Sequence, residues 1–269
     1  MPKVSVIMAT YNCEKTVRES IDSIMNQTFT DWEFVICDDC SSDNTYAVLC
    51  EYKEKHPDKF IIMKNDVNSK LSFSLNRCLE AANGEYMARM DADDIAIETR
   101  FEKEVKFLDE HPDFDAVGGV IRLFDADGPY GRVYYPEYPD KFAPLRKVPF
   151  AHPAVMVRKS AYDKLGGYTV SKMTVRSQDH ELWFRFFAAG FKGYNLQEDV
   201  LFFREDKNAV KRRTAKVRFN HTRILLRGYK MLDYPLRFYP LAFEPMLKAL
   251  VPQKMIYLFH KVTTRKNKG

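Results

Sequence analysis

The chain contains 269 residues, 45% of them hydrophobic, which is enough apolar material for one or two buried cores. Its charge is uneven, because residues 205–269 carry 16 Lys or Arg against 4 Asp or Glu, which leaves the larger front part acidic. An acidic front part without a nucleic-acid motif argues against a nucleic-acid partner, and no apolar run approaches the roughly 20 residues that a membrane-spanning helix needs.

The cysteines and the start of the chain indicate the compartment. Five scattered cysteines, with no second metal-spaced pair beside Cys37 and Cys40, are expected to be reduced thiols. Residues 1–3 lead directly into strand-like sequence, so we expect no signal peptide. Both features predict a cytoplasmic protein.

The first predicted elements are a strand, a polar turn and a helix. Residues 4–9 (VSVIMA) are short, apolar and rich in β-branched side chains, as in a buried strand. Residues 10–13 (TYNC) are polar and mark the end of this strand. Apolar side chains then recur at helical spacing through residues 14–26, which predicts a helix with one face packed on a sheet.

Two further apolar runs end in acidic loops. Residues 32–37 (WEFVIC) predict a second strand, which is followed by the loop 38–43 (DDCSSD). Residues 84–89 (GEYMAR) are followed by the acidic sequence 90–94 (MDADD). This alternation predicts an α/β fold with a mixed, mainly parallel sheet and helices on both faces. Ligands of such sheets bind at the carboxyl ends of strands, so we expect these loops to converge on one crevice.

The acidic sequence also predicts a cation site. Three carboxylates within four residues repel one another, and a cation between them removes that repulsion. Mg²⁺ and Mn²⁺ prefer oxygen ligands and are usually held by one or two carboxylates together with substrate phosphates. The sequence therefore suggests a nucleotide diphosphate bound through a divalent ion, and the alternative is a solvated acidic turn.

Several segments, in the same order along the chain, closely resemble the family 2 glycosyltransferases. The resemblance covers roughly residues 2–205. The segments that carry it are 2–12 (PKVSVIMATYN), 27–29 (QTF), 34–43 (FVICDDCSSD), 84–94 (GEYMARMDADD), 152–158 (HPAVMVR), 166–168 (GGY) and 178–185 (QDHELWFR). The resemblance implies a GT-A fold and an inverting, metal-dependent transfer from a nucleotide sugar, as in bacterial polysaccharide synthesis. We expect a catalytic domain over 1–205, with a nucleotide-sugar half at about 1–110 and an acceptor half at about 111–205, followed by an extension over 206–269.

The resemblance assigns the metal site. Asp93 is expected to coordinate Mn²⁺ or Mg²⁺ directly, and Asp91 to contact the ion or the donor ribose. His152 stands where relatives place a residue near the donor phosphates or the acceptor, and it is a further candidate for the metal site. Asp94 is instead expected to cap the helix predicted at 98–109, since a carboxylate stabilises the exposed N–H groups of a helix start.

The resemblance also assigns the donor site. Thr10 and Tyr11 are expected to border the nucleobase, with the Tyr11 ring as a stacking face and Asn12 in the same loop. Asp39 is expected to accept a hydrogen bond from a ring N–H, which fits uracil or thymine. A UDP-hexose or UDP-N-acetylhexosamine is therefore the expected donor, and a dTDP-sugar is the alternative. Further candidates for donor binding are Asn76, Arg77 and Arg204.

Inverting transfer requires a base for the acceptor hydroxyl, and Asp179 is the candidate. It stands at the start of a helix predicted by the apolar residues that follow it. Gln178 occupies a position where relatives commonly carry Glu, which removes a like charge beside Asp179. The alternatives are Glu181 as the base, and Asp179 as a helix cap only.

The extension 206–269 is basic and rich in large apolar side chains, and its prolines divide it into short pieces. Basic and aromatic residues at helical spacing predict helices on an anionic membrane surface, at the inner face of the cell membrane. The expected acceptor is then a surface polysaccharide or a glycan on a polyprenyl diphosphate. The alternatives are a helical subdomain packed on the catalytic core and a homodimer interface.

A sugar nucleotidyltransferase is the alternative enzyme class. Such enzymes also combine an α/β core with paired carboxylates and a divalent ion. They normally carry a Gly-rich phosphate loop near the first strand, however, and residues 10–13 contain no glycine. This difference favours the glycosyltransferase.

Overall fold

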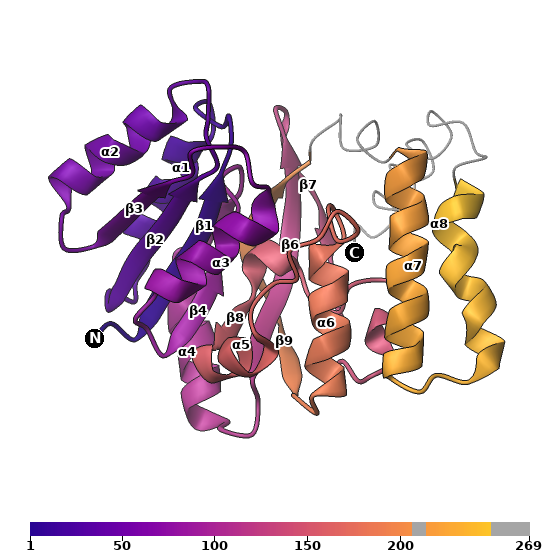
Figure 1. Cartoon of the computed structure of the whole chain (residues 1–269). Coiled ribbons are helices and arrows are strands. Elements are labelled where there is room, and N and C mark those ends of the chain that lie inside the picture. The colour runs from indigo at the N-terminus through magenta and orange to yellow at the C-terminus, as the bar shows by residue number, and fades with distance from the viewer. Residues whose placement is uncertain (206–213, 249–269) are drawn as a thin grey trace.

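The computed structural model describes residues 1–205 and 214–248, which form an α/β fold around one mixed sheet (Figure 1). The strands are β1 (Val4–Thr10), β2 (Trp32–Asp38), β3 (Phe60–Lys64), β4 (Tyr86–Arg89), β5 (Ile95–Ala96), β6 (Ala116–Asp125), β7 (Gly128–Val133), β8 (Met156–Arg158) and β9 (Gly193–Arg204). The α-helices are α1 (Val17–Met25), α2 (Thr45–Lys55), α3 (Leu71–Ala81), α4 (Arg100–Glu110), α5 (Lys159–Leu165), α6 (Gln178–Ala188), α7 (Ala215–Met231) and α8 (Glu244–Leu247). Three 3₁₀ segments are η1 (Ala143–Leu145), η2 (His152–Ala154) and η3 (Leu236–Phe243).

The sheet has the order β3-β2-β1-β4-β8-β6-β9-β5, with β7 paired to β6. Strands β3, β2, β1 and β4 are parallel, whereas β8 runs antiparallel to both β4 and β6. The parallel pairing of β1 with β2 and β4 brings the carboxyl ends of all three strands to one edge. The predicted fold class is confirmed, and the division of residues 1–205 into two halves remains a prediction.

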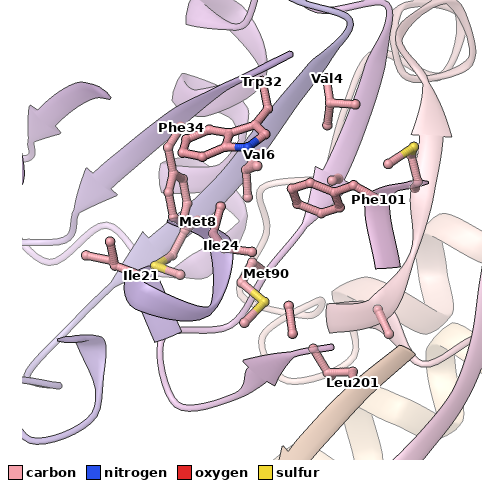
Figure 2. Packing of buried hydrophobic residues seen from close by; sticks show 14 of the residues in the cluster. Val4, Val6, Met8, Ile21, Ile24, Trp32, Phe34, Met90, Phe101 and Leu201 are labelled. Atoms are coloured by element: carbon pink, nitrogen blue, oxygen red, sulfur yellow. The ribbon is translucent and has the colours of Figure 1, made fainter. Parts of the chain in front are cut away.

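Helices cover both faces of the sheet because the side chains of β1 alternate between two cores. Val4, Val6 and Met8 point into one core with α1 and α4, and Figure 2 shows these side chains packed near Ile24 and Phe101. The intervening residues of β1 face a second core, built with helices α3, α5 and α6. The central strands are therefore buried on both faces, as parallel strands in α/β proteins usually are.

Two predicted helices begin later in the structure than in the sequence prediction. Helix α1 starts at Val17, because residues 13–16 form a turn that is closed on the Cys13 carbonyl. Helix α4 starts at Arg100, and the prediction that Asp94 caps it is wrong. Asp94 is followed by strand β5, whose pairing with β9 places the Asp94 carboxylate against the backbone N–H of Arg204 (2.9 Å).

The C-terminal helices pack on the catalytic unit, on the far side from β1–β3 (Figure 1). Gly228 of α7 lies directly on the Phe184 ring of α6, and a Cβ atom at Gly228 would be 2.3 Å from that ring. Buried Ile224, Leu225 and Tyr229 complete this contact. These apolar side chains therefore pack as the subdomain alternative predicted, while residues 206–213 and 249–269 lie outside the described part. None of the described helices is both long and apolar enough to cross a bilayer.

Candidate functional site

The loops that follow β1 and β2 are joined by side-chain hydrogen bonds. Thr10 Oγ1 donates to Asp38 Oδ1 (3.1 Å). The Asn12 backbone N–H donates to Ser41 Oγ (3.0 Å), and Asn12 Oδ1 accepts from the Ser42 N–H (2.8 Å). Asn12 has a φ of 49°, a left-handed conformation that asparagine tolerates better than most residues. Thr10 is buried, so its hydrogen bond to Asp38 joins the two loops where they leave their strands.

Asp39 organises the next loop through its carboxylate. Its Oδ1 accepts from Asn65 Nδ2 (2.7 Å) and from the Ser69 N–H (2.7 Å), and its Oδ2 accepts from the Lys70 N–H (2.9 Å). Arg77 donates to Asn65 Oδ1 (2.7 Å) and so reaches Asp39 through Asn65. A carboxylate offers about four lone-pair positions. One position on Oδ2 is therefore not used by the described residues, on a side chain that is only 4% exposed.

Residues 89–94, which we call the acid loop, have a backbone fixed by three other elements. The carbonyl oxygens of residues 89, 91 and 93 each accept a hydrogen bond from a side chain. The donors are Arg100 of α4 (3.0 Å), Ser20 of α1 (2.8 Å) and Arg204 of β9 (2.8 Å). The backbone geometry of the acid loop is thus set by the protein without any ligand.

The carboxylates of the acid loop are much less well satisfied than its backbone. Asp91 accepts a charged hydrogen bond from Arg89 Nη2 (2.6 Å). Asp94 accepts from the Arg204 N–H, but its buried Oδ2 has no partner among the residues that the structure describes. The Asp93 carboxylate accepts no hydrogen bond from another residue of the described chain. Asp93 is therefore the carboxylate most available to an outside ligand.

The same carboxylates are crowded, since oxygens of Asp91, Asp93 and Asp94 lie within 4.8 Å of one another and only Asp91 is paired with an arginine side chain among the described residues. Asp93 lies at the exposed rim, but the cleft walls desolvate it, and this effect together with the Asp91 charge raises its pKa to about 6. Burial, reinforced by Asp91 and Asp93, raises the pKa of Asp94 well above its ordinary value. A hard divalent cation fits this all-oxygen group and would remove the repulsion.

A cleft of about 870 Å³ opens along the acid loop. This volume is within the range of small-molecule sites. The predicted residues in its lining are Tyr11, Asn12, Asp91, Asp93 and Arg204. The predicted residues outside its lining are Thr10, Asp39, Asn76, Arg77, His152 and Asp179. The structure therefore brings the first loop and the acid loop to one cavity, which β9 closes through Arg204.

Five charged residues that the sequence analysis did not single out also line the cleft, and they are Glu14, Lys15, Asp43, Asp125 and Glu205. Lys15 brings a positive charge to a lining that is otherwise mainly acidic, as binding of a diphosphate would require. Asp43 and Asp125 add carboxylates from the second loop and from the turn between β6 and β7. The Asp-Gly pair at 127–128 signals this turn in the sequence, but no local signal places the hairpin beside the cleft.

Asn76 and His152 both hold the segment around Tyr168. The Asn76 amide bonds the Tyr168 backbone in both directions (2.8 Å each), and the Tyr168 hydroxyl bonds His152 Nε2 (3.0 Å). His152 Nδ1 is buried and has no hydrogen-bond partner within residues 1–205 and 214–248. Burial, together with the charge of Arg89, lowers the pKa of His152 well below its ordinary value, so the imidazole is neutral. The structure does not place His152 in the carboxylate group.

Asp179 lies in the first turn of α6, as predicted. Its Oδ1 accepts from the His180 N–H (2.8 Å), and its other oxygen accepts no hydrogen bond from a described residue. Glu181, the alternative base, is held by Arg185 through both oxygens (2.9 Å each) and by Thr169 (2.9 Å). Of the two acids, Asp179 is the one with an uncommitted oxygen.

Residues 5–166 match the family described as Glycosyl transferase family 2. The chain is 39% identical over 260 residues to the putative glycosyltransferase EpsE of Bacillus subtilis, covering 97% of this chain and 94% of EpsE. It is 25% identical over 227 residues to an Escherichia coli protein, WfaP, covering 84% of this chain and 86% of WfaP. WfaP carries the name UDP-Glc:alpha-D-GlcNAc-diphosphoundecaprenol beta-1,3-glucosyltransferase.

Solved structures show the same fold. TarS of S. aureus in complex with UDP-GlcNAc superposes with a TM-score of 0.70 at 17% identity, covering 90% of this chain and 72% of that one. The mannosyltransferase PcManGT of Pyrobaculum calidifontis, in complex with GDP-Man and Mn²⁺, gives a TM-score of 0.64 at 19% identity, covering 97% and 80%. The family match and the relatives therefore favour a glycosyltransferase over the alternative of a sugar nucleotidyltransferase. The chain belongs to glycosyl transferase family 2.

Proposed function

We propose that this glycosyltransferase moves a hexose or N-acetylhexosamine from a UDP-sugar, with inversion, to a surface polysaccharide or a polyprenyl-diphosphate-linked glycan. The observation that carries the proposal is the acid loop. Its backbone is fixed by three elements, and yet its Asp93 carboxylate lines the cleft and accepts no hydrogen bond from another residue in the described part of the chain. Such a site is built for a cation that arrives with the substrate.

Asp93 and Asp91 would hold Mn²⁺ or Mg²⁺ in this cleft. The ion would offset the negative charge that develops on the departing nucleoside diphosphate. Lys15 supplies a further positive charge in the lining. The three carboxylates within 4.8 Å of one another support this assignment, and so does the Mn²⁺ in the PcManGT complex.

The free lone pair of Asp39 and the ring of Tyr11 support a uridine donor. The Tyr11 side chain is 51% exposed at the cleft, so its face is open for stacking on a base. An imide N–H of uracil is the donor that the remaining Oδ2 position of Asp39 would accept. TarS is described with UDP-GlcNAc and PcManGT with GDP-Man, so the fold alone leaves the base open. A dTDP-sugar remains the alternative donor.

Asp179 would remove the proton of the acceptor hydroxyl as the sugar is attacked from the face opposite the leaving group. Its carboxylate is fixed at one oxygen by the start of α6 and is free at the other. General bases of this kind typically contribute a factor of about 10² to 10⁴. Glu181 is the weaker candidate because Arg185 and Thr169 occupy its carboxylate.

The described part of the extension supports a membrane-surface role for this enzyme, at the inner face of the cell membrane. Within residues 214–248 the exposed basic residues are Lys216, Arg223, Arg227, Lys230, Arg237 and Lys248, and Asp233 is the one exposed acid. Leu236 and Leu247 are 82% and 62% exposed on the outer side of η3 and α8. A homodimer through this face would bring its basic residues against their own copies, which favours an anionic bilayer instead.

A donor panel tests the enzymatic part. Purified protein with Mn²⁺ is incubated with UDP-, dTDP- and GDP-sugars, and the release of nucleoside diphosphate is measured. We expect release from a UDP-sugar, and loss of that release with EDTA. Release from no nucleotide sugar would refute the proposal, and release from a GDP-sugar alone would refute its donor assignment.

Vesicle sedimentation tests the membrane part. We expect the full chain to sediment with vesicles that contain phosphatidylglycerol and not with pure phosphatidylcholine. The double variant Leu236→Asp/Leu247→Asp should lose this binding. Val67→Asp is the matched control, since it places the same charge at a similarly exposed residue (67%) outside the extension. Equal sedimentation of the double variant and the wild type would contradict the membrane assignment.

A further inference from the structure

Arg100 and Glu104 form a fully buried ion pair on the first turns of α4. Both side chains are 0% exposed, and Arg100 Nε lies 3.1 Å from each Glu104 oxygen. A buried ion pair is weak evidence for stability, because desolvation of the two charges offsets their attraction. The pair therefore calls for a role other than stabilising the core.

The other nitrogens of Arg100 reach two segments at the functional site. Nη2 donates to the Arg89 carbonyl at the start of the acid loop (3.0 Å). Nη1 donates to the Pro153 carbonyl in η2 (3.2 Å) and contacts Met90 Sδ (3.7 Å). One guanidinium thus joins α4, the end of β4 and the turn that carries His152.

We propose that Arg100 is a positioning residue that fixes the acid loop so that the Asp93 carboxylate is already in place when the divalent cation binds. This inference rests on the proposed metal site of the glycosyltransferase. Three side chains donate to backbone carbonyls of the acid loop. Of these, Arg100 also donates to the buried Glu104 carboxylate and to the Pro153 carbonyl in η2. The planar guanidinium of arginine holds three nitrogens in fixed directions and so reaches acceptors on three separate segments, whereas a lysine donates from a single nitrogen.

Glu104 completes the arrangement by neutralising Arg100. An unpaired guanidinium beside the acid loop would repel the incoming cation and weaken its binding. Burial raises the pKa of Glu104 to about 7, so above pH 7 an ionised Glu104 bonded to Nε lets Arg100 supply hydrogen-bond donors without adding net charge near the carboxylates. The acid loop keeps both its fixed backbone and its attraction for a cation.

The test compares Mn²⁺ binding in the full chain and in the double variant Arg100→Met/Glu104→Met. The double variant removes both charges together, so no buried charge is left unpaired, and it should remain folded. We expect Mn²⁺ binding, measured by calorimetry in the presence of UDP, to weaken by roughly 10- to 100-fold, as for other residues that orient metal ligands. Binding of metal-free UMP should be unchanged, because the Asp39 loop does not contact Arg100.

Arg132→Met is the matched control. It also removes a guanidinium that is bonded to a carboxylate, but Asp199 keeps Arg122 as a partner (2.7 Å), and neither residue lines the cleft. This control should bind Mn²⁺ as the wild type does. If the double variant does not fold, Arg100→Lys decides, since it keeps a charge beside Glu104 and loses the fork.

The outcomes separate this inference from the proposed function. If the wild type itself binds no Mn²⁺ with UDP, the proposed metal site fails. If the wild type binds Mn²⁺ and a folded Arg100 variant binds it equally well, the positioning role is overturned and the pair belongs to the core alone. Weaker Mn²⁺ binding together with an unchanged urea midpoint and unchanged UMP binding would establish the role.

Discussion

The loops that follow β2 and β4 lie at the same edge of the sheet. They differ in how many hydrogen bonds their carboxylates already accept from the protein. In the β2 loop, Asp39 already accepts three hydrogen bonds from residues 65–70, and one position on its carboxylate is left. In the acid loop after β4, the backbone is equally well fixed, but among residues 1–205 and 214–248 no side chain or N–H of another residue donates to the Asp93 carboxylate, and Asp94 keeps a buried oxygen without a donor. The first loop is hydrogen-bonded without a ligand, whereas the second has the carboxylates that the proposed cation would bind.

This difference separates two ways of binding one substrate. A loop that is already hydrogen-bonded recognises a base by shape and by a single remaining acceptor, at little cost in conformational entropy. A loop with repelling carboxylates binds through charge, so its affinity depends on the metal and on pH. Changes in the two loops should therefore produce distinguishable defects.

The largest expected effect is at the acid loop. Asp93→Asn removes the carboxylate that lines the cleft, so we expect the transfer rate to fall by about 10⁴-fold. This factor corresponds to the several kcal/mol of transition-state stabilisation that a bound metal ion supplies. Asp125→Asn is the control, because it removes a carboxylate from the same lining but outside the carboxylate group. Steady-state kinetics with a UDP-sugar measures both, and a drop below tenfold for Asp93→Asn would contradict the metal assignment.

Asp179 lies in α6, outside both loops, so Asp179→Asn tests whether catalysis also needs a residue of this helix. We expect kcat to fall by about 10³-fold with donor binding unchanged, since a general base acts on the acceptor alone. Glu181→Gln should mainly lower the melting temperature, because Arg185 loses its bidentate partner. A larger loss of kcat for Glu181→Gln than for Asp179→Asn would reverse the two roles.

At the β2 loop, Asp39→Asn should weaken donor binding by roughly 10- to 100-fold. The amide replaces one acceptor oxygen with a donor, which leaves a backbone N–H of the 65–70 segment unpaired at a cost of about 1–3 kcal/mol. Mn²⁺ binding should stay within about twofold of the wild type, because the acid loop is untouched. Calorimetry with UMP and with Mn²⁺ separates the two; equal losses for both ligands would mean that the loops are not independent.

The smallest effect is the pH dependence of metal binding. The pKa of Asp93 is raised to about 6 in the cation-free protein, and the cation requires the ionised carboxylate. The apparent Mn²⁺ affinity should therefore reach a constant maximum above about pH 7, and it should fall about tenfold per pH unit below pH 6. Calorimetry in buffers of different ionisation enthalpy should detect proton release near pH 6. An affinity that is the same at pH 5 and pH 7.5 would be inconsistent with this pKa.

The fold and the convergence of the loops were predictable because they depend on short-range patterns. Apolar runs ending in polar residues define β1, β2 and β4, and parallel pairing then brings their ends to one edge. The start of α4 was misplaced because strand β5, only two residues long, leaves no pattern in the sequence. Its pairing with β9 is what directs Asp94 to Arg204 and away from the helix start.

The partners of individual side chains were much less predictable. The bonds from Asn76 to Tyr168 and from Arg100 to Pro153 join residues 92 and 53 positions apart in the chain. Nothing in the local sequence indicates such contacts. The described apolar residues of the extension likewise have a helical pattern that suits a membrane or a protein core equally well, and the contacts of Gly228, Ile224 and Tyr229 with α6 show where α7 packs.

The most direct test of the account is calorimetric titration of Mn²⁺, in the presence of UDP, into the wild type and into Asp93→Asn. We predict one binding site per chain in the wild type and no measurable binding in the variant, with UMP binding retained in both. Mn²⁺ binding of equal affinity in the two proteins would contradict the central claim that the acid loop is a cation site completed by the Asp93 carboxylate.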